Sequence, residues 1–199
     1  VELLRTSLRE NNLEGFIIPQ SDQFQGEFLN FNDLRLEWIS GFSGSAGLAI
    51  ILKTKAAIFV DGRYETQLNF EIEKRIFEPL SLSYLNLSNW INEKVKGKNK
   101  KIGFDPWLFS ISQFLEIKKS LKNNISLVAT NNLIDDIWIK HKGKTNKFFI
   151  HEKKFSGVTR NNKIKNIIQN LDLKHDFLFL TKPESICWLL NIRGKDYPH

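Results

Sequence analysis

Methionine is absent from the 199 residues, and cysteine, tyrosine and proline are scarce, with 1, 3 and 5 copies. A lone cysteine, Cys187, cannot form a disulfide within the chain, which excludes the small disulfide-stabilised folds of secreted proteins. Its apolar neighbours predict a buried, inert thiol, because a catalytic thiol needs a histidine partner that the sequence does not place. Since an intact gene product ordinarily begins with methionine, we expect this chain to be part of a longer protein.

Long apolar runs are also missing. None approaches the ~18 residues of a membrane-spanning helix, and no basic and apolar leader stands at Val1. These absences predict a cytoplasmic protein without a membrane segment. The hydrophobic content of 41% suits a globular chain that buries about 70% of its unfolded surface, in one domain or two small ones.

The net charge of +7 is unevenly distributed. Residues 1–139 contain 16 Lys and Arg against 17 Asp and Glu, whereas residues 140–199 contain 13 against 5. This shift predicts a boundary near residue 140. A basic region is compatible with nucleic-acid binding, but the lysines just after residue 139 lack interleaved aromatic residues, so solvated surface is the favoured interpretation.

The most informative stretch runs from Leu36 to Tyr64. It holds two short apolar runs, 48–52 and 56–60, joined by the polar turn Lys53–Lys55. Such a pair predicts a β-hairpin. Neither run alternates with polar residues, so both faces of the hairpin should be covered, which places it near the centre of a sheet.

A glycine–serine loop, residues 41–47, precedes this hairpin, and Asp61-Gly62-Arg63 comes after it. The glycines allow positive φ and close backbone approach, so the loop could cradle an anion. The GxGxxG and GxxxxGK[ST] spacings are absent, however, and no helix follows, which favours a tight connection into the hairpin. Asp61-Gly62 predicts a turn, with Arg63 paired to a neighbouring carboxylate.

Helical and strand patterns alternate through the first 139 residues. The helices are expected at 2–13, 64–74, 88–95, 110–121 and 133–138, and the strands at 16–18, 48–52, 56–60, 76–80, 102–104 and 126–129. Gly15 is expected to end the first helix, Asp33 to cap a helical turn over 34–38, Ser88 to begin a helix, and Pro79 to mark an edge strand. The sequence therefore predicts an α/β fold with a mixed sheet covered by helices on both faces.

The last third of the chain repeats the first elements in degenerate form. The matching series are helix 2–13, strand 16–18, Trp38 and Gly41–Gly44, and then helix 160–172, strand 177–180, Trp188 and Asn191–Gly194. The hairpin comes after Gly44, whereas no counterpart of it comes after Gly194. The predicted organisation is a first domain at 1–139, a basic linker at 140–158, and the first part of a second, similar domain at 159–199.

Two ungapped segments, Trp38–Gly47 and Lys55–Tyr64, closely resemble the N-terminal domain of Xaa-Pro aminopeptidases (aminopeptidase P), a domain of the creatinase/prolidase type. The resemblance extends to Ile102–Leu108, Asn132–Trp138 and Trp188–Gly194. It therefore covers nearly the whole chain, and it lies in the non-catalytic part of that family.

The resemblance implies a parent enzyme that removes an N-terminal residue preceding proline, using two divalent metals, Mn²⁺ or Zn²⁺. The metal ligands belong to a C-terminal domain whose motifs no residue here matches, so we expect this region alone to be inactive. His151–Phe155 follows the HExxH zinc pattern only until its last position, where phenylalanine cannot bind metal. The four histidines are expected on solvated surface: His141, His151, His175 and His199.

The family resemblance also suggests that N-terminal domains help to build a homodimer and restrict access to the cleft that takes peptides with proline in second position. It nominates Ser43, Ser45 and Arg63 as cleft-facing residues, with Arg193 as a further candidate, while a plain packing role stays open for each. Two other classes also stay open. One is a non-catalytic interaction module that keeps the peptidase fold, as in certain histone-chaperone subunits, and the other is a basic nucleic-acid-binding domain.

Overall fold

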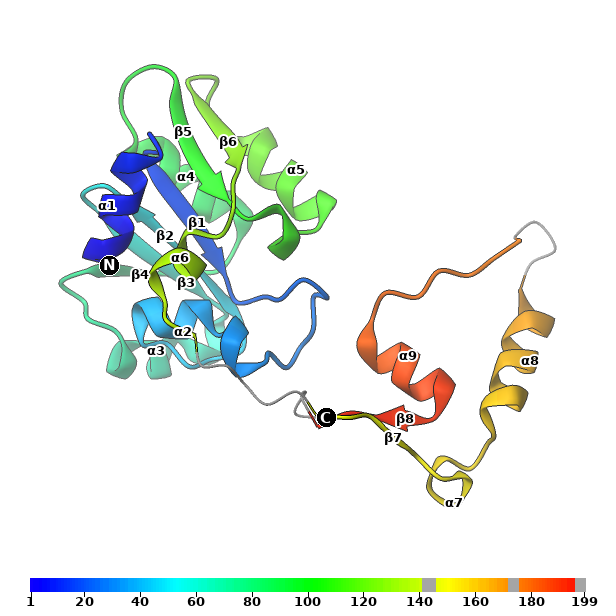
Figure 1. Ribbon diagram of the computed structural model, residues 1–199. Helices are drawn as coiled ribbons and strands as arrows, with labels where there is room; N and C mark the ends of the chain where they lie inside the picture. The colour runs from blue at the N-terminus through cyan, green and yellow to red at the C-terminus, as the bar shows by residue number, and fades with distance from the viewer. Residues whose placement is uncertain (141–145, 172–175, 196–199) are drawn as a thin grey trace.

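The computed structural model describes residues 1–140, 146–171 and 176–195. The first of these segments forms a six-stranded mixed sheet flanked by helices, and the other two form a smaller group of elements (Figure 1). The predicted α/β class with a mixed sheet is confirmed. Among the residues described, no helix combines the length and the apolar character needed to cross a membrane.

The six-stranded sheet has the strand order β4-β3-β2-β1-β5-β6. Its strands are β1 (Gly15–Pro19), β2 (Gly47–Leu52), β3 (Ala56–Val60), β4 (Phe77–Ser81), β5 (Lys100–Phe104) and β6 (Ile125–Ala129). The expected hairpin is β2 and β3, paired antiparallel with Ala49 opposite Ile58. β1 is antiparallel to β2 and parallel to β5. Among the described strands β4 pairs in parallel with β3 alone and is an edge strand, as Pro79 predicted.

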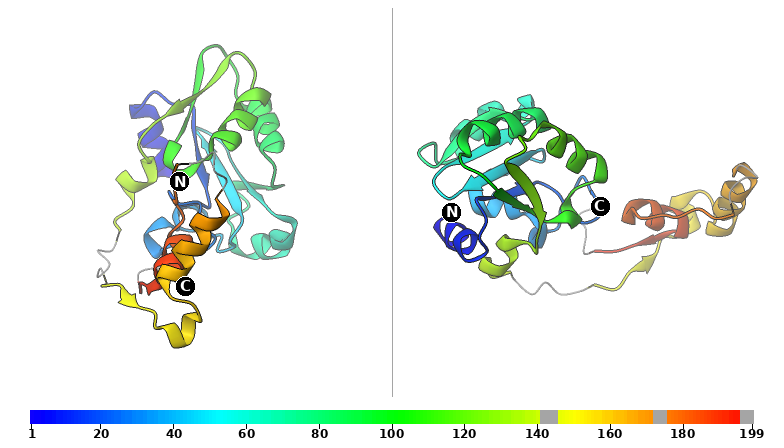
Figure 2. Two further views of the ribbon diagram at one scale, coloured as in Figure 1. Left: turned by 90° about the vertical axis from the view of Figure 1, so that its right-hand side faces the viewer. Right: turned by 90° about the horizontal axis from the view of Figure 1, so that it is seen from above.

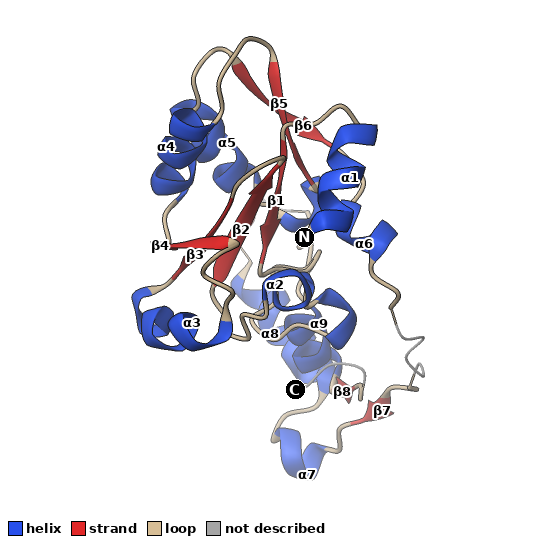
Figure 3. Ribbon diagram, turned by 90° about the vertical axis from the view of Figure 1, so that its left-hand side faces the viewer, coloured by secondary structure: helices blue, strands red, loops and turns tan. Residues whose placement is uncertain are grey.

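Helices cover both faces of this sheet, with α4 and α5 on one side and α1, α2 and α6 on the other (Figure 3). The helices of this region are α1 (Glu2–Glu10), η1 (Phe31–Asp33), α2 (Arg35–Ser40), η2 (Gly62–Tyr64), α3 (Glu65–Glu71), α4 (Tyr84–Lys94), η3 (Pro106–Leu108), α5 (Ile111–Ser120) and α6 (Leu133–Ile137).

Successive residues of the central strands enter opposite layers, which explains the apolar runs without alternation. Ile50 and Phe59 pack with Leu87 and Ile91 of α4, whereas the adjacent Ile51 and Ile58 belong to the opposite layer. That opposite layer also contains residues of α1, α2 and α6: Leu4, Leu8, Leu36, Ile39, Leu133 and Ile134. The hairpin is therefore buried on both faces, as the sequence predicted.

The smaller group consists of β7 (Phe149–Ile150), α7 (Lys153–Ser156), α8 (Arg160–Asn170), α9 (Pro183–Leu190) and β8 (Ile192–Arg193). β7 pairs antiparallel with β8, and the group lies outside the six-stranded sheet (Figure 2). In the described parts of 146–195 only Lys163 and Asn191 are buried. Large apolar side chains are exposed throughout the group: Phe148, Phe149, Ile150, Phe155, Val158, Ile168, Phe177, Leu178, Phe179, Trp188 and Leu190.

Two expectations for this group are wrong. Residues 177–180 are not a strand, and Phe177 and Phe179 are 82% and 83% exposed. An apolar run becomes a strand only where a neighbour supplies ladder hydrogen bonds, and no described strand pairs with this run. Cys187 is half-buried rather than buried. In addition, the expected linker 140–158 contains β7 and α7, which the sequence did not predict.

Three helix boundaries also differ from expectation. The N-cap of α4 is Ser83, which accepts from the Asn86 N–H at 2.9 Å, and Ser88 lies inside the helix. The apolar face of α4 begins at Leu87, so the earlier serine caps it. Asp33 does not cap α2 but pairs with Arg35 at 3.0 Å.

Gly15 does not end the first helix, because α1 ends at Glu10 with Asn11 as its C-cap. Gly15 is instead the first residue of β1, where a Cβ would meet the backbone oxygen of Ile51 at 3.0 Å. The glycine is therefore needed for close strand packing rather than for a helix end.

The internal repeat has a structural counterpart in two helix ends. α2 ends at Gly41 with φ 82°, and α9 ends at Asn191 with φ 52°, both in the left-handed region. Trp38 and Trp188 stand three residues before these caps. Glycine and asparagine are the residues that adopt this conformation at least cost, so both helix ends follow from local sequence.

Candidate functional site

Three of the four nominated residues lie in one place. Ser43 and Ser45 belong to the loop between α2 and β2, and Arg63 belongs to η2, directly after β3. Because β2 and β3 are antiparallel, with Gly47 opposite Val60, the start of β2 adjoins the end of β3. The hairpin therefore brings residues 41–47 beside residues 61–71.

Ser43 is bound to the end of α3 through Glu71. Its backbone N–H donates to Glu71 Oε2 at 2.9 Å, and its hydroxyl donates to Glu71 Oε1 at 2.7 Å. The Gln67 amide donates to Ser43 Oγ and to Glu71 Oε1, both at 2.9 Å. Burial opposes the charged form of Glu71, yet these hydrogen bonds outweigh it and lower its pKa. The anionic group that this loop binds is therefore the carboxylate of Glu71 in the same chain.

The second half of the loop is bound to η2. Ser45 Oγ and the Tyr64 hydroxyl lie 2.7 Å apart, within hydrogen-bonding distance. The Tyr64 ring meets the buried Phe42 ring edge-on, with centroids 5.7 Å apart. A Cβ on Gly44 would collide with the Phe42 ring, so this position requires glycine. Ser43 and Ser45 therefore use their hydroxyls to join the loop to the neighbouring segment.

Arg63 is an exposed member of the cluster, with 71% of its side chain accessible. Its Nε donates to Asp61 Oδ1 at 2.8 Å, and its Cζ lies 5.5 Å from the centroid of the Tyr64 ring. Hydrogen bonds from the Arg63 side chain and amide lower the pKa of Asp61, and the same carboxylate raises the pKa of Arg63. The predicted pairing of Arg63 with a carboxylate is confirmed.

Arg193 does not join this cluster through any contact of that kind. Its Nη1 donates to the carbonyl oxygens of Cys187 at 3.3 Å and of Ile192 at 2.8 Å. The guanidinium therefore lies at the C-terminal end of α9, where a cation is favoured by the helix dipole.

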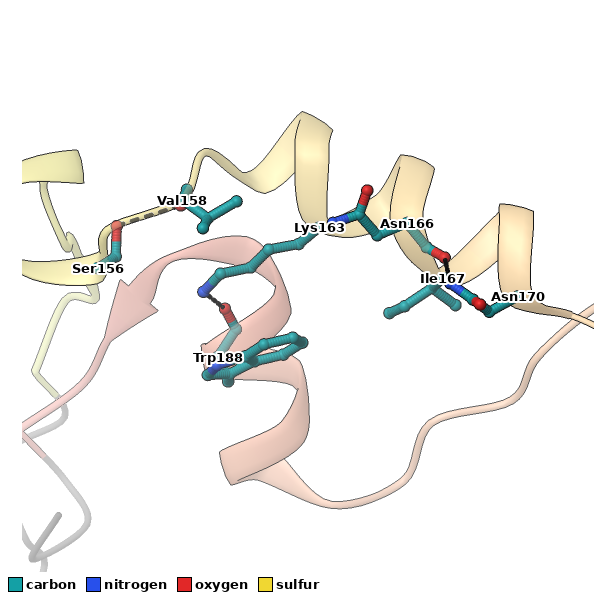
Figure 4. Close-up of a pocket in the computed structure, with 7 residues that line it drawn as sticks. All are labelled: Ser156, Val158, Lys163, Asn166, Ile167, Asn170 and Trp188. Carbon is teal, nitrogen blue, oxygen red and sulfur yellow. Dashed lines mark hydrogen bonds between the residues drawn. The ribbon is translucent and has the colours of Figure 1, made fainter.

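A cavity of about 350 Å³ lies between α8 and α9 (Figure 4). Lys163 on one wall is 7% exposed and donates to the carbonyl oxygen of Trp188 at 2.8 Å and to Asn191 Oδ1 at 2.7 Å. Its Nζ also lies 4.3 Å from the centroid of the Trp188 ring, a cation–π distance. The other lining residues are Ser156, Val158, Asn166, Ile167 and Asn170.

Possible metal ligands are scattered over the described part of the chain. In residues 1–140, 146–171 and 176–195, no three His, Cys, Asp or Glu side chains are grouped to hold a metal ion. His151 stacks on the Phe155 ring with centroids 5.8 Å apart. His141, His175 and His199 lie outside the described residues. The described residues therefore do not fit the two-metal centre that the family resemblance implies for the parent enzyme.

Two family models match the chain. Residues 1–137 match the creatinase/prolidase N-terminal domain, and residues 140–199 match a second model with the same description. The chain belongs to the creatinase/prolidase N-terminal domain family. Probable Xaa-Pro aminopeptidase P from Aspergillus fumigatus is 36% identical over 98% of this chain, and Xaa-Pro aminopeptidase 2 from Rattus norvegicus is 33% identical over 98%.

Within its family the chain corresponds to the N-terminal domain of Xaa-Pro aminopeptidases. It spans 31% of the Aspergillus relative and 30% of the rat relative, about a third of each. Among solved structures, X-prolyl aminopeptidase from Caenorhabditis elegans, described as a cytosolic enzyme with a di-nuclear active site, matches 94% of this chain. The match has 26% identity and a TM-score of 0.80, and it covers 31% of that enzyme.

The N-terminal domain of the cytoplasmic peptidase PepQ from Mycobacterium tuberculosis matches more distantly. It has 21% identity and a TM-score of 0.55, over 68% of this chain and 95% of that domain. At this identity the match concerns the fold alone.

Sequence reasoning missed Glu71, Gln67 and Lys163. Glu71 lies 28 residues from Ser43, so no local pattern links the two. The sequence did contain a signal for Glu71, however. A carboxylate at the C-terminal end of a helix interacts unfavourably with the helix dipole, so its presence there indicates a stabilising tertiary contact. Lys163 stands among polar residues of α8, and only its burial reveals that it contacts α9.

Proposed function

We propose that this chain is the non-catalytic N-terminal region of a proline-specific metalloaminopeptidase and forms part of the wall of its active-site cleft. The parent enzyme hydrolyses the bond between an N-terminal residue and a proline in second position. The observation that carries the proposal is the exposed Arg63 guanidinium, presented by a loop cluster that is cross-linked at Ser43 and Ser45. The family membership and the relatives at 33–36% identity support the substrate class.

Arg63 suits a wall that meets peptides. Its planar guanidinium has donors beyond the Nε that Asp61 engages, and such groups bind carboxylate and carbonyl oxygens with defined geometry. Asp61 and the Tyr64 ring hold the side chain near the hairpin, which limits the entropy lost when it binds. In this proposal Ser43 and Ser45 hold the wall in place, and Arg193 belongs to a separate, second part of the cleft.

The two divalent metals of the parent enzyme, Mn²⁺ or Zn²⁺, are proposed to lie in a catalytic domain outside these residues. When bound they activate the attacking water and polarise the scissile carbonyl. The di-nuclear active site of the Caenorhabditis elegans enzyme supports their number. We further propose the division into domains 1–139 and 159–199. The large apolar side chains exposed in 146–195 support this division, because a complete domain would bury them, whereas the first part of a second domain leaves them exposed.

The same region is proposed to contribute to a homodimer in the cytoplasm, with a second copy of the chain rather than nucleic acid as its partner. The cytosolic description of the Caenorhabditis elegans enzyme supports the compartment. Sedimentation of the intact protein tests the dimer, since a monomer at micromolar concentration contradicts it.

Arg63→Ala in the intact enzyme tests the cleft wall. We expect KM for Xaa-Pro peptides to rise about tenfold, the effect of losing one charge-assisted hydrogen bond, with kcat within about twofold. Arg75→Ala is the control, because Arg75 is exposed and lies beyond α3. Equal KM values for the two variants contradict a peptide contact by Arg63. Absence of any peptidase activity in the unmodified protein favours a non-catalytic interaction module instead.

A further inference from the structure

Glu71 occupies a position that is unfavourable for its own helix. It is the last residue of α3, where the exposed carbonyl groups carry negative partial charge and disfavour a carboxylate. A residue that breaks a local rule in this way is expected to be retained by tertiary interactions. The interactions here all involve the glycine–serine loop and α3 itself.

The loop meets Glu71 at two points. The Glu71 carboxylate accepts both the backbone N–H and the hydroxyl of Ser43, at 2.9 and 2.7 Å. The Glu71 backbone oxygen lies so near Gly41 that a Cβ there would stand 2.9 Å from it. Phe42 anchors the loop in the core, and the Glu71 carboxylate satisfies the two donors of the exposed Ser43 that follows it.

A second set of contacts continues from the loop to Arg63. Ser45 Oγ lies 2.7 Å from the Tyr64 hydroxyl, and the Tyr64 ring lies beneath the Arg63 guanidinium, 5.5 Å from its Cζ. A shift of the loop therefore moves the Tyr64 ring, and with it the surface on which Arg63 rests.

We propose that Glu71 is a positioning residue, whose carboxylate fixes the loop 41–47 and thereby sets the place of the Arg63 guanidinium. This inference rests on the proposed function, in which Arg63 contacts the peptide. Gln67 supports Glu71, because its amide donates to Glu71 Oε1 and to Ser43 Oγ at 2.9 Å each. Glu71 itself touches no substrate in this scheme.

The test compares Glu71→Gln with Glu65→Gln in the intact enzyme. Glu71→Gln keeps the size of the side chain but replaces one acceptor of Ser43 by a donor, whereas Glu65 is exposed in the first turn of the same helix. We expect Glu71→Gln to raise KM for Xaa-Pro peptides about three- to tenfold, the effect of one lost hydrogen bond, with kcat within about twofold. Glu65→Gln should leave both constants unchanged.

The double variant Arg63→Ala with Glu71→Gln separates the two proposals. If Glu71 acts through Arg63, the double variant has the KM of Arg63→Ala alone. A raised KM for Arg63→Ala with a normal KM for Glu71→Gln overturns the inference and leaves the cleft wall standing. Additive effects of the two substitutions also overturn it, because Glu71 would then act independently of Arg63.

NMR spectroscopy tests the positioning role of Glu71 independently of any activity assay. The Ser43 amide proton should shift as Glu71 titrates, with a midpoint below the ordinary glutamate value of about 4.3. Glu71→Gln should abolish this shift, and it should change the chemical shift of the Arg63 Nε–H at pH 7, where Asp61 is ionised in both proteins. A Ser43 amide that does not titrate, or an Arg63 resonance that is unchanged in Glu71→Gln, overturns the inference even where Arg63→Ala leaves KM unaffected.

Discussion

Among the residues that the structure describes, each part of the chain buries one cation, and the two parts stabilise it in different ways. Arg35 and Lys163 are both 7% exposed. Arg35 donates to both carboxylate oxygens of Asp135, at 2.7 and 3.0 Å, and to Asp33 at 3.0 Å. Lys163 donates to a backbone carbonyl and to the side-chain amide of Asn191, so neutral acceptors hold it.

The difference reflects how much of each part is buried and how far apart in the sequence its contacting residues lie. The Arg35–Asp135 pair joins residues 100 apart in the sequence, and beside it Trp38 stacks on Trp138 with ring centroids 5.7 Å apart. These contacts fasten α6 to α2 over a core buried on both faces of the sheet. Lys163 instead joins residues 28 apart and fixes one corner of a group that buries no described apolar side chain.

Replacing a large apolar side chain by alanine should show the largest difference between the two parts in the free energy of unfolding. Phe16 is fully buried in β1, and Phe16→Ala should lower the free energy of unfolding by about 3–5 kcal/mol through lost burial and a cavity. In the 199-residue chain, Phe177→Ala makes the same chemical change at a side chain that is 82% exposed, and should stay within about 0.5 kcal/mol. Urea unfolding measures both. Similar losses would mean that residues 176–180 are buried in solution by another surface.

Acid should act on the first part through Asp135. Burial opposes ionisation of this carboxyl, but hydrogen bonds from Arg35 and Lys140 outweigh it and lower its pKa. The folded state therefore binds fewer protons than the unfolded one, so the stability is present above the ordinary aspartate value and is lost as pH falls through the folded value.

We expect Asp135→Asn to cost about 2 kcal/mol at pH 7, because Asp135 is partly exposed and Arg35 keeps Asp33. The variant should also lose less stability than the unmodified protein between about pH 5 and pH 3. Urea unfolding across this range is the measurement, with Asp136→Asn, an exposed neighbour, as control. Parallel pH profiles would contradict the coupling.

Substitutions at the two left-handed helix caps, Gly41 and Asn191, should differ least between the two parts in their effect on stability. Gly41→Ala puts a Cβ at φ 82° and 2.9 Å from the Glu71 backbone oxygen, so it should cost about 1–2 kcal/mol. Asn191→Gly keeps the backbone conformation but loses the hydrogen bonds to Lys163 and Val158, for about 1 kcal/mol confined to its own group.

Hydrogen exchange reads the Asn191→Gly effect directly at the His151 amide, which donates to the Asn191 carbonyl at 2.7 Å. Faster exchange there, with the β2 and β3 amides unchanged, is the expected result. Faster exchange in those two strands as well would show that the two parts unfold together.

The central hairpin could be predicted because its two apolar runs record burial on both faces directly in the sequence. The strand expected at 177–180 failed on the same kind of signal, since an apolar run specifies burial but not the partner that completes a ladder. The expected cap of α4 at Ser88 failed for a different reason. Either serine can cap a helix, and only the position of Leu87 in the core decides between them.

The candidate site was partly predictable. The pairing of Arg63 with Asp61 is local and followed from a turn sequence. The partners of Ser43 could not be predicted, because Glu71 comes near only after β2 and β3 pair, which brings the loop before β2 beside the segment that leads into α3. Tertiary pairing, rather than local propensity, selects those contacts.

The turn from Lys53 to Lys55 has a consequence for variation in chain length. Since the Leu52 N–H donates to the Lys55 carbonyl at 2.7 Å, the turn sets the register, or phase, in which β3 pairs with β2. One inserted residue that shifted this phase would direct Ile58 toward α4 and Phe59 toward α1, exchanging side chains of unequal volume between layers. We expect natural relatives to lengthen this turn in steps that preserve the phase, while the solvent-facing turn near Gly97 accepts any length.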